Sequence, residues 1–252
     1  MLTTFEDSPA FSSPIATAAT GGVPEIKPVP KKEAGRVLSP LNVWLAAGLT
    51  LAPIPIGLAG AIAGLVLAAN LYSRIPALAG ACAIAGLAWG ATWVFALVAF
   101  QHFLASRYLR WVARRTFAGR ADLLVRPDDA EADFVDVMTR GHWEAAMLEP
   151  ATDTGFLKID HSRRELLLEG DNKRYRIPFS AVSTCEVEEF ALGAEKWEAD
   201  LHFMTVLSFE TANGPRELPL SGKHLEFKPR RAAQRRAQAN ELCGRILMAL
   251  NA

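Results

Sequence analysis

The chain has 252 residues, half of them hydrophobic, and its 27 lysines and arginines balance its 27 acidic residues. After residue 120 the balance turns acidic, with 17 basic against 23 acidic residues, which excludes the basic domain typical of nucleic-acid binding. The three cysteines are odd in number and form no C-x-x-C motif, which argues against a disulfide framework and against a zinc site.

Residues 1–40 are rich in Ser, Thr, Ala, Pro and Gly and show no apolar period. This composition predicts a disordered cytoplasmic tail. The segment begins with acidic residues and has no basic region followed by a short apolar core, so it is not expected to be a signal peptide.

Two apolar runs, 41–72 and 76–104, dominate the next part of the chain. Arg74 is the one charged residue between Arg36, which precedes them, and Arg107, which follows them. Each run exceeds the ~20 residues that a helix needs to cross the hydrocarbon core of a bilayer. We therefore predict a transmembrane helical hairpin that turns at residues 73–75. Because neither run contains an acid, a lysine or an arginine at depth, a carrier or pump is disfavoured.

Pro53 and Pro55 interrupt the first run. A proline inside a helix removes a backbone hydrogen bond and clashes with the preceding turn. The prolines therefore either kink one long span, which is the interpretation that we favour, or separate an interfacial segment 41–52 from a shorter span that begins at residue 54.

Each run also carries a G-x-x-x-G motif, with Gly60 and Gly64 in the first and Gly86 and Gly90 in the second. Small residues four apart allow two helix backbones to approach closely in a membrane. We predict that these glycines are helix-packing positions, either within the hairpin or between copies in a homo-oligomer.

Basic residues lie outside both ends of the hairpin, whereas its turn has Arg74 alone. Positive residues favour the cytoplasmic side, so we expect an inner-membrane protein with both termini in the cytoplasm. Residues 105–132 are predicted to form a basic juxtamembrane helix and an acidic linker. The helix has four arginines that are candidates for contact with the membrane surface, namely Arg107, Arg110, Arg114 and Arg115.

From residue 133 the pattern changes to short strands separated by turn residues. The clearest strand is 201–210, where apolar residues alternate, and Asn213-Gly214 then predicts a hairpin turn. Residues 229–250 carry an apolar stripe at helical spacing. We predict a cytosolic α+β domain over 133–252, an antiparallel meander or barrel of about seven strands with a C-terminal helix.

This order of elements, with the stretches GFLKID (155–160), LLLEG (166–170) and RYRIP (174–178), resembles the pleckstrin-homology-like (PH-like) superfold, including bacterial PH-like and GRAM-like domains attached to membrane helices. The resemblance implies a binding module. Phosphoinositide-binding members of that family use a basic cluster across their first hairpin. Lys158, Arg163 and Arg164 occupy a comparable hairpin here, with a different spacing, and are candidates for contact with the membrane surface or an anionic ligand.

The closing helix begins with four arginines, Arg230, Arg231, Arg235 and Arg236. Positive charge is unfavourable at a helix N-terminus, so these residues are candidates for contact with an anionic partner. The alternative is a solvated charged face.

Motifs that would carry catalysis are weak. Asp200 and His202 share a strand face, and Glu186, Glu188 and Glu189 form an acidic patch, but both sets are better explained as solvent-exposed polar residues. We assign no catalytic, cofactor-binding or metal-binding residue.

The sequence as a whole favours a non-catalytic membrane protein that presents a PH-like binding or scaffolding module. Its partners would be the lipid bilayer, with anionic lipid headgroups or another membrane protein, and no nucleic acid. The alternatives are a small channel or transport accessory subunit that assembles through its small-residue helix faces, and a membrane enzyme whose site the sequence does not reveal.

Overall fold

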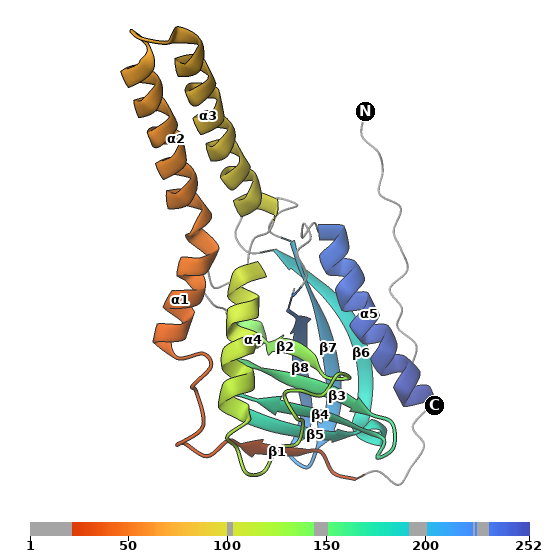
Figure 1. Cartoon of the computed structure of the whole chain (residues 1–252). Helices are drawn as coiled ribbons and strands as arrows, with labels where there is room; N and C mark the ends of the chain where they lie inside the picture. The colour runs from red at the N-terminus through yellow and green to blue at the C-terminus, as the bar shows by residue number, and fades with distance from the viewer. Residues whose placement is uncertain (1–21, 100–102, 144–150, 192–200, 224, 226–231) are drawn as a thin grey trace, which may run out of the picture. The chain divides into compact units, whose positions relative to one another are not determined.

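The computed structural model describes residues 22–99, 103–143, 151–191, 201–223, 225 and 232–252 (Figure 1). The chain divides into two compact units. The first, here called the sheet unit, comprises residues 1–38, 113–223 and 231–252. The second, the hairpin unit, comprises residues 39–112 and 224–230.

The hairpin unit is helical, with α1 (Pro40–Leu51), α2 (Pro53–Leu71) and α3 (Pro76–Ala99), followed by α4 (Phe103–Phe117), whose last residues belong to the sheet unit. Each of the first three helices begins at a proline, which lacks only an N–H that would be unpaired in a first turn. Two stretches, Pro40–Leu71 and Pro76–Leu97, are long and apolar enough to cross a membrane.

The first apolar run is therefore two consecutive helices that meet at Ala52. This residue keeps right-handed helical angles, with φ −51° and ψ −35°, and Pro53 begins the second helix. The interruption falls at the prolines, where the sequence predicts a kink.

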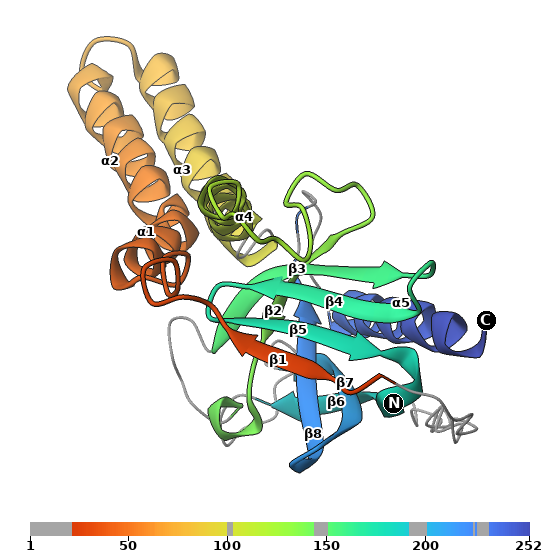
Figure 2. The same cartoon turned by 90° about the horizontal axis from the view of Figure 1, so that it is seen from below.

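The sheet unit contains one antiparallel sheet of eight strands in the order β1-β5-β4-β3-β2-β8-β7-β6 (Figures 1 and 2). Strand β2 lies in the middle and joins the β3–β5 meander to the β6–β8 meander. Short 3₁₀ turns lie at Arg140–His142 and Phe179–Ala181, and the closing helix α5 spans Ala232–Asn251. The strands are β1 (Glu25–Pro28), β2 (Asp133–Val137), β3 (Asp153–Asp160), β4 (Glu165–Gly170), β5 (Lys173–Pro178), β6 (Val182–Ala191), β7 (Leu201–Thr211) and β8 (Gly214–Gly222).

The antiparallel sheet with a C-terminal helix is confirmed, because seven strands and α5 occupy the predicted region. The eighth strand corrects the prediction of a disordered tail over 1–40. Residues 25–28 form β1 and pair with β5 at the edge of the sheet (Figure 2), and Val29 and Val37 are buried. All four β1 residues are exposed, so this strand leaves no apolar period in the sequence. Residues 1–21 lie outside the described part of the chain.

The main core lies between the sheet and α5. Leu242, Ile246 and Leu250 from the predicted apolar stripe are buried in it together with strand residues such as Leu168 and Leu207. Burial of each such side chain contributes roughly 1.5–3 kcal/mol to folding. α5 packs mainly on β6, β7 and β8, and the core cluster that it joins also contains side chains of β4 and β5.

Strand β7 differs from its prediction in one respect. Its alternate residues Phe203, Leu207 and Phe209 are buried as expected, but Met204 and Val206 on the opposite face are buried as well. These two side chains pack in a second cluster with Met138 and Trp143. The alternation in the sequence predicts one buried and one exposed face, whereas the central residues of β7 are covered on both faces.

Candidate functional site

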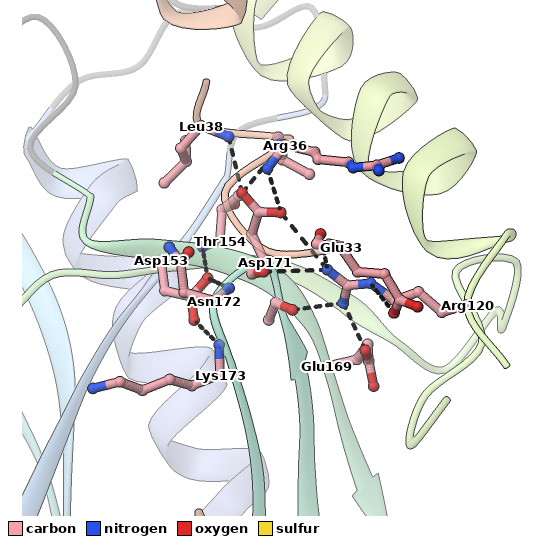
Figure 3. Close-up of polar contacts among 12 residues, drawn as sticks. Glu33, Arg36, Leu38, Arg120, Asp153, Thr154, Glu169, Asp171, Asn172 and Lys173 are labelled. Carbon is pink, nitrogen blue, oxygen red and sulfur yellow. Dashed lines mark hydrogen bonds and ion pairs between the residues drawn. The ribbon is translucent and has the colours of Figure 1, made fainter. Parts of the chain in front are cut away.

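Arg120 is the centre of a buried group of charges at the turn between β4 and β5 (Figure 3). Its Nη1 donates to Glu169 Oε1 at 2.6 Å and to the carbonyl of Gly170 at 2.7 Å. Its Nη2 donates to the carbonyls of Asp171, at 3.2 Å, and Glu33, at 3.3 Å. The guanidinium also lies 4.0 Å from the centroid of the Phe117 ring. The arginine thus holds the segment that follows α4 against the β4–β5 turn.

Glu169 is fully buried, and its carboxylate is stabilised by Arg120 and by two further donors. Its Oε1 also accepts from Arg174 Nε at 2.9 Å, and its Oε2 accepts from the backbone N–H of Leu124 at 3.0 Å. A buried charge without partners is strongly destabilising. The two arginines and one backbone donor explain why a glutamate is tolerated in the sequence LLLEG.

Asp171 fixes the N-terminal segment to the same turn (Figure 3). Its carboxylate accepts the backbone N–H groups of Arg36, Val37 and Leu38 at 3.2, 2.9 and 3.1 Å. Burial raises the pKa of Asp171, whereas these donors and Arg120 act in the opposite direction. Leu38 directly precedes Ser39, the residue whose side chain caps α1.

Asp153, on the neighbouring strand β3, binds the backbone of the β4–β5 turn. Its carboxylate accepts the backbone N–H groups of Thr154, Asn172 and Lys173, each at 2.9 Å. Burial raises the pKa of Asp153 to about 6, although the three backbone donors oppose the rise. We refer to Arg120, Asp153, Glu169 and Asp171 together as the charge clamp.

The charge clamp joins the two chain segments that lead into and out of the hairpin unit. Residues 33–38 precede α1, and residues 117–124 follow α4; both are held on the β4–β5 turn by the contacts above. The three carboxylates of the clamp are each held by arginine or backbone N–H donors of the protein itself. The chemistry of the clamp is therefore that of a structural anchor.

A cavity of about 330 Å³ lies beside the clamp and is lined by Glu33, Arg36, Arg115, Thr116, Gly119 and Arg120. We call it the arginine pocket. Arg120 Nε is buried, makes no hydrogen bond within the described residues, and lies 4.0 Å from Glu33 Oε2. Guanidinium groups are suited to carboxylate and phosphate because they present planar, fixed donors. The pocket therefore has the chemistry to accept an anionic group.

The predicted membrane-surface arginines of α4 differ in their surroundings. Arg115 lines the arginine pocket, and Arg114 Nε donates to the carbonyl of Pro127 at 3.1 Å. The Arg107 guanidinium lies 5.2 Å from the Phe103 ring centroid. Arg110 is half-buried. The structure brings only Arg115 of this set into the pocket.

The basic residues of the β3–β4 hairpin are not gathered into one site. Lys158 Nζ lies 2.6 Å from Asp129 and 3.2 Å from Glu131, so its charge is offset by acids of the linker. Arg163 is exposed, and Arg164, which has φ +54°, lies over the Phe179 ring at 5.7 Å.

At the start of α5, Arg236 pairs with Glu189 at 2.9 Å and lies over the Phe203 ring. Arg235 is half-buried, and Arg230 and Arg231 lie outside the described residues. The ion pair with Glu189 on β6 thus offsets one of the positive charges at the start of α5.

The weak catalytic motifs are not supported by the contacts around them. Glu188 forms an ion pair with Arg140 at 2.5 Å, and the His202 ring stacks on Phe190 with 5.4 Å between centroids. Asp200 lies outside the described residues. Across the described ranges, no group of three His, Cys, Asp or Glu side chains could hold a metal ion.

The four predicted packing glycines lie where α2 and α3 meet. A Cβ built on Gly64 would lie 2.5 Å from the Cα of Gly86, and one on Gly86 would lie 2.8 Å from the Cα of Gly64. A Cβ on Gly60 would overlap the Trp89 ring, whose Nε1 donates to the carbonyl of Ile56 at 3.2 Å. At Gly90 the nearest atom would be Ala61 Cβ at 3.3 Å.

Sequence reasoning did not identify the charge clamp. In the sequence Arg120 is one of several basic residues after the second apolar run, and Asp171 lies between two short predicted strands. One signal was present, since Glu169 follows three consecutive leucines in a strand, and a charged residue inside such an apolar run needs a partner. The partner could not be identified, because Arg120 is 49 residues away.

Comparison of the chain with protein-family models, with curated proteins and with solved structures finds no match. The functional argument therefore depends on the residues and contacts described above.

Proposed function

We propose that the protein is a multi-pass protein of the inner (cytoplasmic) membrane, with both termini in the cytoplasm. Its sheet unit would be a non-catalytic, PH-like binding module that takes the headgroup of an anionic lipid in the arginine pocket. The observation that carries the binding proposal is the pocket itself, which three arginines line together with one acid, Glu33, so that positive charge is in excess.

Membrane insertion is supported by exposure as well as by length. Only 17% and 11% of the most apolar windows of the two candidate spans are buried. Large side chains such as Leu58, Ile84 and Phe95 are exposed on them. A core helix of a soluble protein would be mostly buried, so lipid is the environment that best accounts for these surfaces.

The PH-like assignment is supported by the order of elements. Strands β2–β5 and β6–β8 form two consecutive antiparallel meanders, and α5 follows them and covers the core. This is the arrangement that the resemblance implies, with β1 added at the edge. Fold alone does not define a ligand, so the binding proposal depends on the pocket.

The position of the pocket in the chain favours a lipid. Arg36 lies three residues before Ser39, the cap of α1, and Arg115 lies in the last turn of α4. Positive charge at the C-terminal end of α4 is also favourable for the helix dipole. Arg36 and Arg115 line the pocket beside Arg120, so we assign the contact with an anionic headgroup to these three arginines together.

The channel or transport-accessory alternative receives less support. It requires copies to assemble through the small-residue faces, but Gly60, Gly64, Gly86 and Gly90 face the partner helix of the same hairpin. Within the described residues these faces are covered inside one chain, so a different surface would have to mediate assembly.

The test uses the full-length protein purified in mild detergent and supplied with equal amounts of phosphatidylglycerol and phosphatidylcholine. Native mass spectrometry would count the lipids retained by the wild type, by Arg36→Gln/Arg115→Gln, and by the control Arg163→Gln/Arg216→Gln. The control removes the same charge from two exposed positions outside the pocket.

We expect the wild type and the control to retain phosphatidylglycerol selectively. The pocket variant should lose about tenfold or more of this selectivity, because hydrogen bonds to charged groups contribute roughly 1.5–3 kcal/mol each. Equal retention by all three proteins would reject the pocket as the binding site. Loss in the control alone would transfer the site to the surface around Arg163 or Arg216.

A further inference from the structure

Two cysteines that are far apart in the sequence meet in the core of the sheet unit. Cys185 lies on β6 and Cys243 on α5, 58 positions apart, and their Sγ atoms are 3.3 Å from each other. Their exposed fractions are 3% and 7%. The sequence argued against a disulfide framework because the cysteines are odd in number and form no C-x-x-C motif, but the fold brings two of the three together.

The geometry is close to that of a disulfide. A disulfide holds its sulfur atoms about 2.05 Å apart, so the two Sγ atoms would have to approach by roughly 1.3 Å. The helix already follows β6 closely, since Val182, Cys185, Leu242 and Ile246 share one core cluster. An approach of this size is of the order that rotation of the two side chains can supply.

We propose that Cys185 and Cys243 form a reversible intramolecular disulfide when the protein meets a hydroperoxide, which would cross-link α5 to β6. In the reduced protein the pair acts as part of the core, and in the oxidised protein it covalently holds the closing helix on the sheet.

The chemistry balances with hydrogen peroxide as the oxidant. The thiolate of Cys243 attacks one peroxide oxygen, the O–O bond breaks, and the leaving hydroxide takes up a proton to become water. The sulfur of Cys185 then attacks the resulting sulfenic acid, the S–S bond forms, and a second water leaves. Two thiols and one peroxide thus give one disulfide and two waters.

The order of the two steps follows from the contact between the thiols. Cys185 donates a hydrogen bond to the sulfur of Cys243, which lowers the pKa of Cys243, whereas the same contact and burial raise the pKa of Cys185. Cys243 is also the more exposed of the two. The Cys243 thiol also donates to the backbone carbonyl of Cys185 at 3.3 Å, and we assign the first attack to Cys243 because its sulfur is the more accessible one.

The remaining cysteine provides an internal control. Cys82 lies on α3 of the hairpin unit and is only partly buried. It has no cysteine near it in sequence or in the described hairpin, so it cannot form the same intramolecular bond.

The experiment treats reduced full-length protein in detergent with hydrogen peroxide, then labels the remaining thiols with a polyethylene-glycol maleimide. A denaturing gel counts the labels, and intact mass together with peptide mapping identifies the bond. The variants are Cys82→Ser, Cys185→Ala and Cys243→Ala, and their melting temperatures under reducing conditions show whether each is folded.

We expect oxidation to remove two labels and two hydrogens from the wild type and from Cys82→Ser, to link the two peptides, and to raise the melting temperature. A reducing agent should reverse all four changes. Neither alanine variant should form the link. The proposal is overturned if the folded wild type keeps three labels, if it gains oxygen on Cys243 without a linked peptide, or if it only forms dimers through Cys82.

Discussion

Arg120 Nη1 lies 2.6 Å from Glu169 Oε1, and the two side chains are only 1% and 0% exposed. This ion pair connects the segment after α4 with the last residues of β4. Because Glu169 also accepts from Arg174, and Arg120 also donates to three carbonyls, the pair is the centre of a network. Its loss would therefore affect more than one contact.

The first prediction concerns this pair. Arg120→Met should lower the free energy of unfolding by about 3–5 kcal/mol, because it leaves Glu169 with less compensation in the interior. Arg163→Met, which removes an exposed arginine, should change it by less than about 0.5 kcal/mol. Thermal unfolding of full-length protein, followed by tryptophan fluorescence, measures both.

A double-mutant cycle with Glu169→Leu distinguishes pairing from packing. The double variant should be less destabilised than the sum of the two single variants, because the second substitution removes the buried charge that the first left with fewer partners. Strict additivity would mean that the ion pair has no coupling energy.

The second prediction concerns the N-terminal segment. Asp171→Ala removes the acceptor for the N–H groups of Arg36, Val37 and Leu38. Hydrogen exchange at residues 36–38 should then become faster, since local opening no longer breaks these bonds. Asp160→Ala, which removes an acceptor in the exposed β3–β4 turn, should leave exchange at 36–38 unchanged.

The third prediction is a pH dependence. The pKa of Asp153 rises from 3.8 to about 6 on folding, so folding takes up a proton between these values. The stability associated with that proton is fully present below pH 3.8 and is lost as the pH rises through 6. Relative to Asp153→Asn, which cannot titrate, the wild type should lose stability as the pH rises from about 4 to about 7.

The difference between the two proteins is the informative quantity, because burial raises the pKa of Asp171 as well and affects both. Chemical unfolding at several pH values measures this difference. A constant difference across the range would show that Asp153 does not titrate there.

The fourth prediction concerns the helical hairpin. Gly64→Leu or Gly86→Leu should lower expression and thermal stability, because a Cβ at either position would overlap the backbone of the other helix. Gly80→Leu on the same helix as Gly86 is the matched control, since a Cβ there meets no atom within 4 Å. Similar behaviour of all three variants would show that the close approach of α2 and α3 is not required.

The fifth prediction concerns topology. Reporter fusions at Ala10, Arg74 and Ala252 should place only Arg74 outside the cytoplasm, because basic residues flank both outer ends of the hairpin. An external C-terminus would contradict both the proposed orientation and the proposed cytosolic module.

Local sequence patterns were sufficient for the elements whose burial repeats along the chain. The uncharged runs predicted the helices of the hairpin, and the alternation over 201–210 predicted β7. The stripe through Leu242, Ile246 and Leu250 predicted the buried face of α5. In each case the period of the apolar residues matches the period of the helix or strand, so the pattern lies within a few neighbouring residues.

The remaining features were decided by tertiary structure, because each joins positions that no local pattern connects. Strand β1 is entirely exposed and exists through its pairing with β5, so residues 25–28 show no strand period. Arg120 becomes a buried ion-pair partner only because the end of α4 reaches Glu169. Likewise, Cys185 and Cys243 meet only when α5 packs on β6, since a chain contact over 58 positions is formed by the fold and not by local sequence.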